Sequence, residues 1–296
     1  MKQIITRFLY LTLFVVLMKS NFAQDSTKTK KEKSHFEACV KYLSRNVYLG
    51  RTDSAKISYI SPTFGYFHKS GFHLIGSLSY MPNDAANRID VSTIEAGYDF
   101  NLGKKFYGGL YADEFFYNTG SFAVNAEIHT GLGFYAGYDL NFITLNGGVG
   151  YSLGSQSDLV TETGIGHSFF ADKERLEIAP NFTMKSGTQN YYNAYFTSGR
   201  AKKAGIANSK GRGRGNNSGS GSGAVLTTTI VGSSQFKVLD YELSMPITYK
   251  IKNWKFLLTP TYAIPVNPAT IENNMILTKE SISNHLYQEL EITFSF

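Results

Sequence analysis

A strict alternation of apolar residues with polar or glycine residues is the strongest structural signal in this 296-residue chain. It is longest over residues 122–140, where Phe122, Ile128, Leu132 and Tyr138 fall on one face. Successive side chains of a β-strand point to opposite faces, so the pattern predicts an extended strand with one apolar face. Globular strands usually have about 5–6 residues. The alternation therefore favours an all-β fold with unusually long strands.

The same two-residue period returns along the rest of the chain, at residues 94–102, 143–153, 239–251 and 286–296. In a soluble barrel the apolar face points inward, whereas in a transmembrane barrel it faces lipid. Because the period is the same in both cases, other features must decide between these two orientations.

The connections between the predicted strands alternate in length, which is typical of barrels inserted from one side of a membrane. Short turns are expected at residues 69–71, 101–105, 139–141, 171–175 and 251–254. Mostly longer loops are expected at residues 81–87, 117–121, 154–158, 185–234 and 266–285. The pattern predicts an antiparallel up-and-down barrel of about twelve strands, with ten or fourteen as alternatives. The first strand is placed near residues 46–50, and residues 189–196 either extend the ninth strand or fold over the mouth.

The C-terminal sequence HLYQELEITFSF alternates to the last residue and ends in the aromatic Phe296. It resembles the closing-strand signal of Gram-negative outer-membrane β-barrel proteins. That resemblance implies a barrel in the bacterial outer membrane, surrounded by outer-membrane lipid. It identifies no narrower family and no function.

The N-terminus has the pattern of an export signal, with Lys2 and Arg7 before an apolar run and the small residue Ala23 before the expected cleavage site. The sequence predicts a signal peptide over residues 1–23, a flexible polar tail over 24–42 and the barrel over 43–296. Removing the signal peptide lowers the formal charge from +6 to +3. The single cysteine, Cys39, supports no disulfide framework.

Residues 198–223 form a Gly- and Ser-rich segment without aromatic or acidic residues, so a disordered surface loop is predicted there. Its basic residues are Arg200, Lys202, Lys203, Lys210, Arg212 and Arg214. Nucleic-acid binding is disfavoured, because the segment lacks interleaved aromatic residues and belongs to an exported chain. Small solutes and anionic surface polymers are the expected partners. The sequence does not determine the oligomeric state.

If the apolar faces point outward, the polar residues of the strands line the lumen. The lumen-facing candidates are Glu95, Asp99, Glu127, His129, Glu162, Asp240, Glu242, Lys250, Glu289 and Glu291. Acidic residues predominate in this set, and an acidic lumen favours cations. The alternative is that these groups pair across strands and close the interior.

No catalytic, metal-binding or cofactor-binding residues are predicted, and we expect the chain not to be an enzyme. His167 and Ser168 are adjacent on a presumed strand, which sends their side chains to opposite faces. The first functional hypothesis is a narrow channel for passive passage of small solutes. The second is a closed barrel with a structural or surface-interaction role through its cationic loop. A barrel lipid hydrolase is a distant third.

Overall fold

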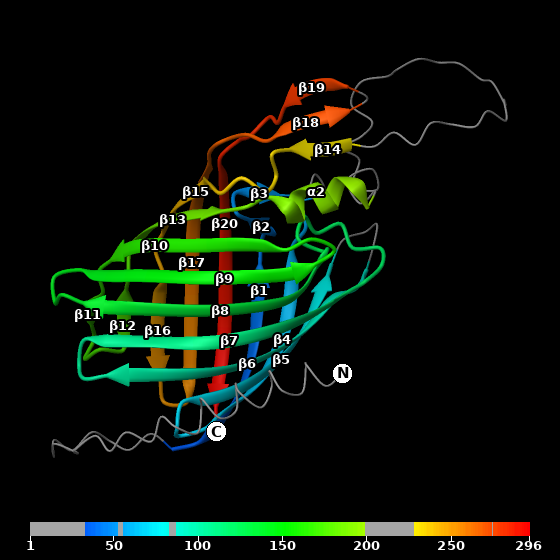
Figure 1. The fold of residues 1–296 in the computed structure, drawn as a ribbon. Coiled ribbons are helices and arrows are strands. Elements are labelled where there is room, and N and C mark those ends of the chain that lie inside the picture. The colour runs from blue at the N-terminus through cyan, green and yellow to red at the C-terminus, as the bar shows by residue number, and fades with distance from the viewer. Residues whose placement is uncertain (1–32, 53–55, 83–86, 199–227, 274) are drawn as a thin grey trace, which may run out of the picture. The chain divides into compact units, whose positions relative to one another are not determined.

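The structure is a computed structural model that describes residues 33–52, 56–82, 87–198, 228–273 and 275–296. Within residues 33–296, antiparallel strands form one closed barrel of 12 strands, as Figure 1 shows. The predicted strand count is thus confirmed. The wall consists of β1 (His35–Leu43), β4 (Tyr59–Phe67), β5 (Phe72–Met81), β6 (Arg88–Leu102), β7 (Phe106–Tyr117), β8 (Ile128–Asp139), β9 (Thr144–Gly154), β10 (Asp158–Gly166) with β11 (Phe169–Ala171), β12 (Leu176–Ile178) with β13 (Asn181–Gly187), β15 (Lys237–Ser244) with β16 (Ile247–Ile251), β17 (Trp254–Pro265) and β20 (His285–Ser295).

The two ends of the sheet meet at the closing strand β20, which pairs with β1 on one side and with β17 on the other. The register places Val40 opposite Ile292 and Lys41 opposite Glu291. Apart from the short segment β11, which pairs only with β12, every described strand of the wall has a hydrogen-bonded neighbour on both sides. Such closure is the condition for a β-structure to span a membrane.

The first strand begins earlier than the sequence predicted. Residues 33–42 were assigned to the flexible tail, but β1 starts at His35 and contributes a full strand to the wall. Its sequence alternates outward Phe36 and Val40 with inward Glu37 and Lys41. The signal was missed because the inward residues are charged and the preceding segment is rich in lysine. Residues 24–32 of the predicted tail lie outside the described residues.

The predicted strand over residues 122–140 is also wrong at its start, because β8 begins only at Ile128. Residues 121–127 instead fold as turns, in which Val124 and Ala126 are buried. A register shift between Ile128 and Thr130 separates this segment from the regular part of the strand. Apolar and polar residues alternate in this buried turn segment as they do in the strand, and the strand predicted from the sequence was therefore too long.

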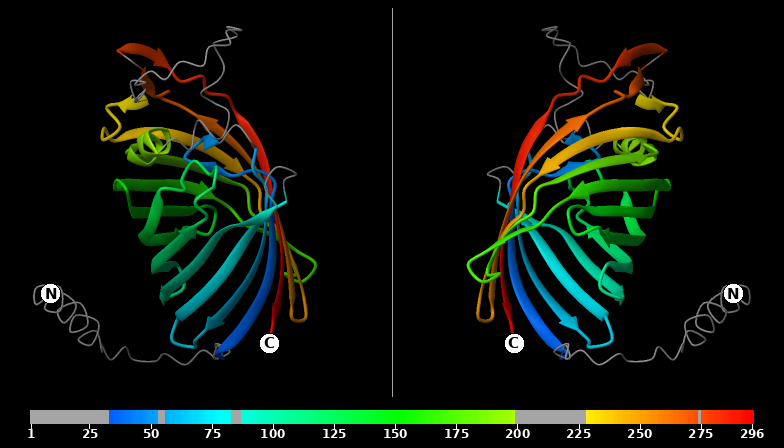
Figure 2. Two further views of the ribbon diagram at one scale, coloured as in Figure 1. Left: turned by 90° about the vertical axis from the view of Figure 1, so that its right-hand side faces the viewer. Right: turned by 90° about the vertical axis from the view of Figure 1, so that its left-hand side faces the viewer.

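The longer connections fold over one end of the barrel. They carry β2 (Val47–Tyr48), β3 (Arg51–Thr52), the helix α2 (Asn190–Thr197), β14 (Thr228–Val231), β18 (Thr270–Asn273) and β19 (Ile276–Lys279). Of the two alternatives for residues 189–196, folding over the mouth is therefore the one observed. Figure 2 shows these elements gathered at the end opposite the C-terminus.

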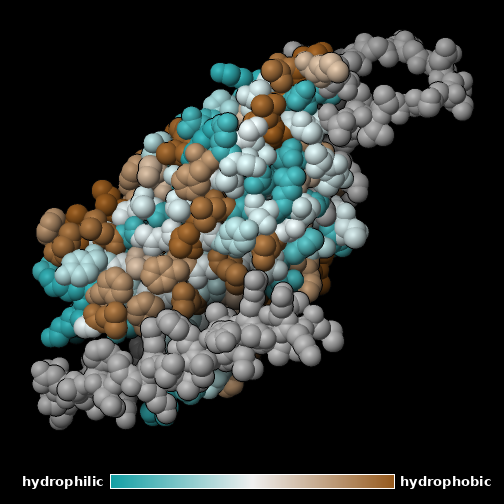
Figure 3. All heavy atoms as spheres, viewed as in Figure 1, coloured by the Kyte–Doolittle hydropathy of each residue, from teal (hydrophilic) through white to brown (hydrophobic). Residues whose placement is uncertain are grey.

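Apolar side chains of the wall point outward. Leu110, Leu132 and Leu243 are 53%, 45% and 50% exposed although they lie within strands. Aromatic residues such as Tyr138 and Trp254 are exposed beside the short turns, where aromatic girdles of outer-membrane barrels lie. On the face seen in Figure 3, apolar residues gather toward the short-turn ends of the strands. Among the described residues, no helix is long and apolar enough to cross a membrane.

We predict that Leu110→Arg destabilises the barrel by about 2–4 kcal/mol, because it places a charge on the lipid-facing surface. Leu110→Ile is the control, since it keeps the surface apolar. Denaturant-induced unfolding of barrels refolded into lipid vesicles measures the difference. Equal stability of the two variants would mean that this face does not contact hydrocarbon.

Candidate functional site: a polar lumen beneath a cap

The inner surface of the barrel carries three groups of charged side chains. The first surrounds Lys185 on β13, whose Nζ lies 2.9 Å from a carboxylate oxygen of Glu242 and 3.7 Å from one of Glu162. The hydroxyl of Tyr287 donates to Glu242 over 3.0 Å. Asp240 is fully buried nearby, and neither of its carboxylate oxygens has a hydrogen-bond partner among the described residues.

The second group lies toward the short turns, where the closing strand meets its neighbours. Lys41 on β1 lies 3.4 Å from Glu289 and 3.7 Å from Glu291, and Lys255 on β17 lies 3.1 Å from Glu291. Both lysines thus pair with carboxylates of β20. Lys250 on β16 is opposite Lys255 in register and is exposed.

The third group, on β5 to β8, is an acidic wall formed by Glu95, Asp99 and Asp113. His73 is the only basic side chain that pairs with it among the described residues, with its ring nitrogens 3.1 Å from Glu95 and 3.2 Å from Asp99. The hydroxyl of Tyr135 donates to Asp99. Asp113 is opposite Glu95 in register, so two carboxylates face each other across adjacent strands.

Glycines on the inner face make room for the large side chains of this wall. Tyr111 is opposite Gly133 in register, and Tyr107 is opposite Gly137. A Cβ atom on either glycine would collide with the ring of its tyrosine partner. The inward tyrosines of one strand therefore require glycine at the opposite positions of the next strand. This requirement explains why the inner face of these strands is rich in glycine.

Two cavities remain inside the barrel between these groups. One of about 270 Å³ lies next to Asp113, Glu162 and Lys185. The other, of about 330 Å³, lies next to Lys41, Glu95 and Glu291. Their charged linings favour occupation by water, because apolar cavities stay dry whereas polar ones hold ordered water.

The loop-side mouth is closed by a packed core, which we call the cap. The cap comprises β2 and β3, residues 121–127, α2, β14 and residues 266–273. Its buried residues include Leu49, Val124, Tyr191 and Tyr195, which cluster with Leu239 of the wall. Burial raises the pKa of Tyr48 to about 12 and that of Tyr191 well above its usual value. These two phenols therefore stay neutral across the physiological pH range.

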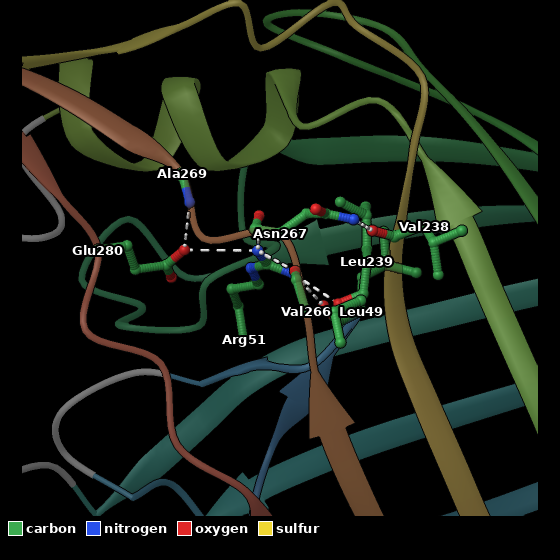
Figure 4. Close-up of polar contacts among 8 residues, drawn as sticks. All are labelled: Leu49, Arg51, Val238, Leu239, Val266, Asn267, Ala269 and Glu280. Atoms are coloured by element: carbon green, nitrogen blue, oxygen red, sulfur yellow. Dashed lines mark hydrogen bonds and ion pairs between the residues drawn. The ribbon is translucent and has the colours of Figure 1, made fainter.

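Arg51 on β3 holds the parts of the cap together and is only 2% exposed. Its guanidinium donates to backbone carbonyls over 2.9–3.2 Å and lies 3.4 Å from the carboxylate of Glu280, as Figure 4 shows. The carbonyls belong to Leu49, Leu239, Val266 and Asn267. Leu239 is part of the wall, whereas Val266, Asn267 and Glu280 belong to the loop after β17. One buried charge thus ties two loops to one barrel strand.

Asp158, at the start of β10, fixes α2 to the wall. Its carboxylate accepts hydrogen bonds from the backbone N–H groups of Asn190 and Tyr191, both over 2.7 Å, and from the hydroxyl of Thr188 over 2.6 Å. A carboxylate satisfies free N–H groups of the first helical turn and interacts favourably with the helix dipole. The helix is therefore anchored at its N-terminus.

The structure places most of the predicted lumen residues on the inner face, but not all of them. Glu127 lies in the turn before β8, and His129 lies at the register shift and is exposed. Both were misplaced because the predicted strand started too early. The basic residues from Arg200 to Arg214 lie outside the described residues.

Sequence reasoning missed several residues that organise the interior. Lys41 was assigned to the tail, and Arg51 lies in a loop for which the sequence offered no burial signal. His73 and Asp113 alternate correctly with apolar neighbours, so the two-residue period could have found them. Ser168 donates to Glu177 over 2.8 Å, while the ring of His167 contacts Phe169. Among the described residues, no group of three or more His, Cys, Asp or Glu residues could hold a metal ion.

We predict that Arg51→Met loosens the cap, because it leaves four carbonyls and Glu280 without their common donor. Breaking a buried charge pair costs about 3–5 kcal/mol. Amide hydrogen exchange in α2 and β18 should accelerate, while β5 to β8 stay protected. Arg45→Met, in the same loop, is the control. Unchanged exchange in α2 and β18 would contradict the role assigned to Arg51.

No family model matches the sequence, and no curated protein matches it either. Among solved structures, the chain is similar to the KdgM porin at 8% identity and a TM-score of 0.48, covering 88% of this chain and 99% of that one. It is also similar to the COG4313 outer membrane channel from Pseudomonas putida F1, at 8% identity and a TM-score of 0.43. That match covers 93% of this chain and 100% of the channel.

LpxR from Salmonella typhimurium matches at 10% identity and a TM-score of 0.39, and the match covers 87% of this chain and 99% of LpxR. Identities this low transfer no substrate and no activity to this chain. The closed sheet, the apolar outer surface and the alternation of short turns with mostly longer loops make the chain an outer-membrane-type β-barrel.

Proposed function

We propose that the protein provides a narrow, gated passage for small cationic solutes across the outer membrane. The observation that carries this proposal is the pair of charged cavities inside the barrel, of about 270 and 330 Å³, beneath a cap made only of loop segments. A barrel with a purely structural role needs no such cavities. Packing the same volume with apolar side chains would remove the cost of burying charges.

The preference for cations follows from the imbalance of charge on the inner face. Two of the three groups pair lysines with carboxylates, but among the described residues His73 is the only basic side chain that pairs with the acidic wall. The acidic wall therefore carries a net negative charge. Carboxylates that line a pore attract cations and repel anions.

The cap determines when the passage opens. In this conformation the buried core around Arg51 fills the loop-side mouth, so solutes cross only when the cap moves. Because the cap belongs to loops rather than to the wall, it can move without breaking the barrel ladder. Removing Arg51 should shift the equilibrium toward the open form.

The conductance of purified protein in planar lipid bilayers tests this proposal. We expect the wild type to be closed for most of the time and Arg51→Met to conduct steadily, with Arg45→Met resembling the wild type. Under a salt gradient, the reversal potential of the open form should show a preference for cations. Combined Glu95→Gln and Asp99→Asn substitutions should reduce that preference, because they remove charge from the acidic wall. The absence of conductance in Arg51→Met, with the barrel folded, would contradict the proposal.

A closed barrel with a surface-interaction role is the second candidate. The packed cap favours it, because the cap presents an ordered surface at the loop side of the barrel. Under this alternative, Arg51→Met stays non-conducting and the binding of surface polymers depends on the basic residues 200–214. Deleting those residues while retaining the barrel separates the two candidates.

A further inference from the structure

Neighbouring strands of the wall are interrupted at the same place. The breaks in three strands fall at residues 167–168, 179–180 and 245–246, between β10 and β11, between β12 and β13, and between β15 and β16. The adjacent β17 is continuous and its pairing with β20 is unbroken there, but its pairing with β15 and β16 skips Thr259 and Pro260. In Figure 1, β10 and β13 run across the view whereas β11, β12 and β16 run down it. The wall therefore changes direction along one line.

Three prolines lie on this line, one in each of three adjacent strands: Pro180, Pro246 and Pro260. Proline has no N–H group, so it interrupts the ladder without leaving an unpaired donor. Each proline carbonyl still accepts a hydrogen bond from the neighbouring strand, over 2.9–3.2 Å. The donors are the N–H groups of His167, Ala179 and Met245, in the same order. The break therefore exposes few unsatisfied polar groups, which is required of a surface in contact with hydrocarbon.

The change of direction leaves a groove of about 580 Å³ on the outer surface, which we call the proline groove. Its lining includes outward side chains that are 39–61% exposed: Ile165, Phe182, Leu243, Met245, Tyr262 and Leu286. Volumes of about 300–1,000 Å³ are typical of sites that bind small molecules. No charged side chain of the described residues, apart from the ionisable His167, lines the groove.

We propose that the proline groove binds one acyl chain of a membrane lipid. The groove lies on the lipid-facing surface, within the strands that span the membrane, so hydrocarbon is the medium around it. Its apolar lining and satisfied proline carbonyls disfavour water. An acyl chain is narrow and flexible enough to follow a bent wall. A smaller recess of about 450 Å³ lies on the outward faces of β8 and β9, beside Phe134 and Val149, whereas Leu110 and Leu132 line neither recess.

Photochemical labelling of the full-length barrel in lipid vesicles tests this site. The probe is a phosphatidylethanolamine with a diazirine on one acyl chain, and mass spectrometry locates the labelled residues. We expect label at Phe182 and Met245 in clear excess over Leu110 and Leu132, which are also exposed on the outer surface. Equal labelling of all four positions would mean that lipid only surrounds the barrel and would overturn the proposal.

Leu243→Trp is the matched variant, because the larger ring fills the groove from an outward position. It should lower the label at Met245 to the level found at Leu110, while Leu110→Trp on β7 leaves the label at Met245 unchanged. Unboiled gels check that both variants keep the folded barrel. Undiminished label at Met245 in Leu243→Trp would contradict the proposal. Protection of both Phe182 and Met245 from label would contradict it too, because a second copy of the chain would then cover the groove.

Discussion

The closure of the backbone hydrogen-bond ladder between β1, β20 and β17 is the constraint on which the rest of the structure depends. In hydrocarbon an unpaired N–H or C=O group costs several kcal/mol, so a sheet with free edges cannot span a membrane. Closure also fixes which side chains point outward, because the side-chain period of a strand is two residues. The apolar outer surface and the charged interior are therefore two consequences of one register.

The interior shows what happens when polar residues are forced inward. Lysines on β1, β13 and β17 pair with carboxylates on β10, β15 and β20, and inward tyrosines lie over glycines of the adjacent strand. These contacts cross between strands and so reinforce the register as well as satisfying charge. The acidic wall is the exception, since His73 is the only basic side chain that pairs with its carboxylates among the described residues. This excess of negative charge distinguishes the interior from that of a barrel whose inner side chains serve only to stabilise the fold.

The sequence predicts the wall well and the cap poorly, for a physical reason. Strands such as 94–102 and 286–296 carry the two-residue period themselves, so their outward and inward residues can be assigned without tertiary information. The cap has no such period, because its segments are buried by contacts distant in sequence. Arg51, for example, reaches carbonyls of Leu239 and Val266. The early start of β1 was hidden by its charged inward residues, and the buried turn at 121–127 mimicked a strand.

The central claim is that a water-filled lumen lies beneath a closed cap, and the single native cysteine provides the most direct measurement. Cys39 on β1 lines the inner cavity of about 330 Å³ toward the short turns. A small, charged, membrane-impermeant thiosulfonate should fail to label Cys39 in intact cells, where the loops face outward. It should label Cys39 once the short-turn side is exposed in broken outer membranes. Labelling of the wild type in intact cells, or no labelling from either side, would contradict the account.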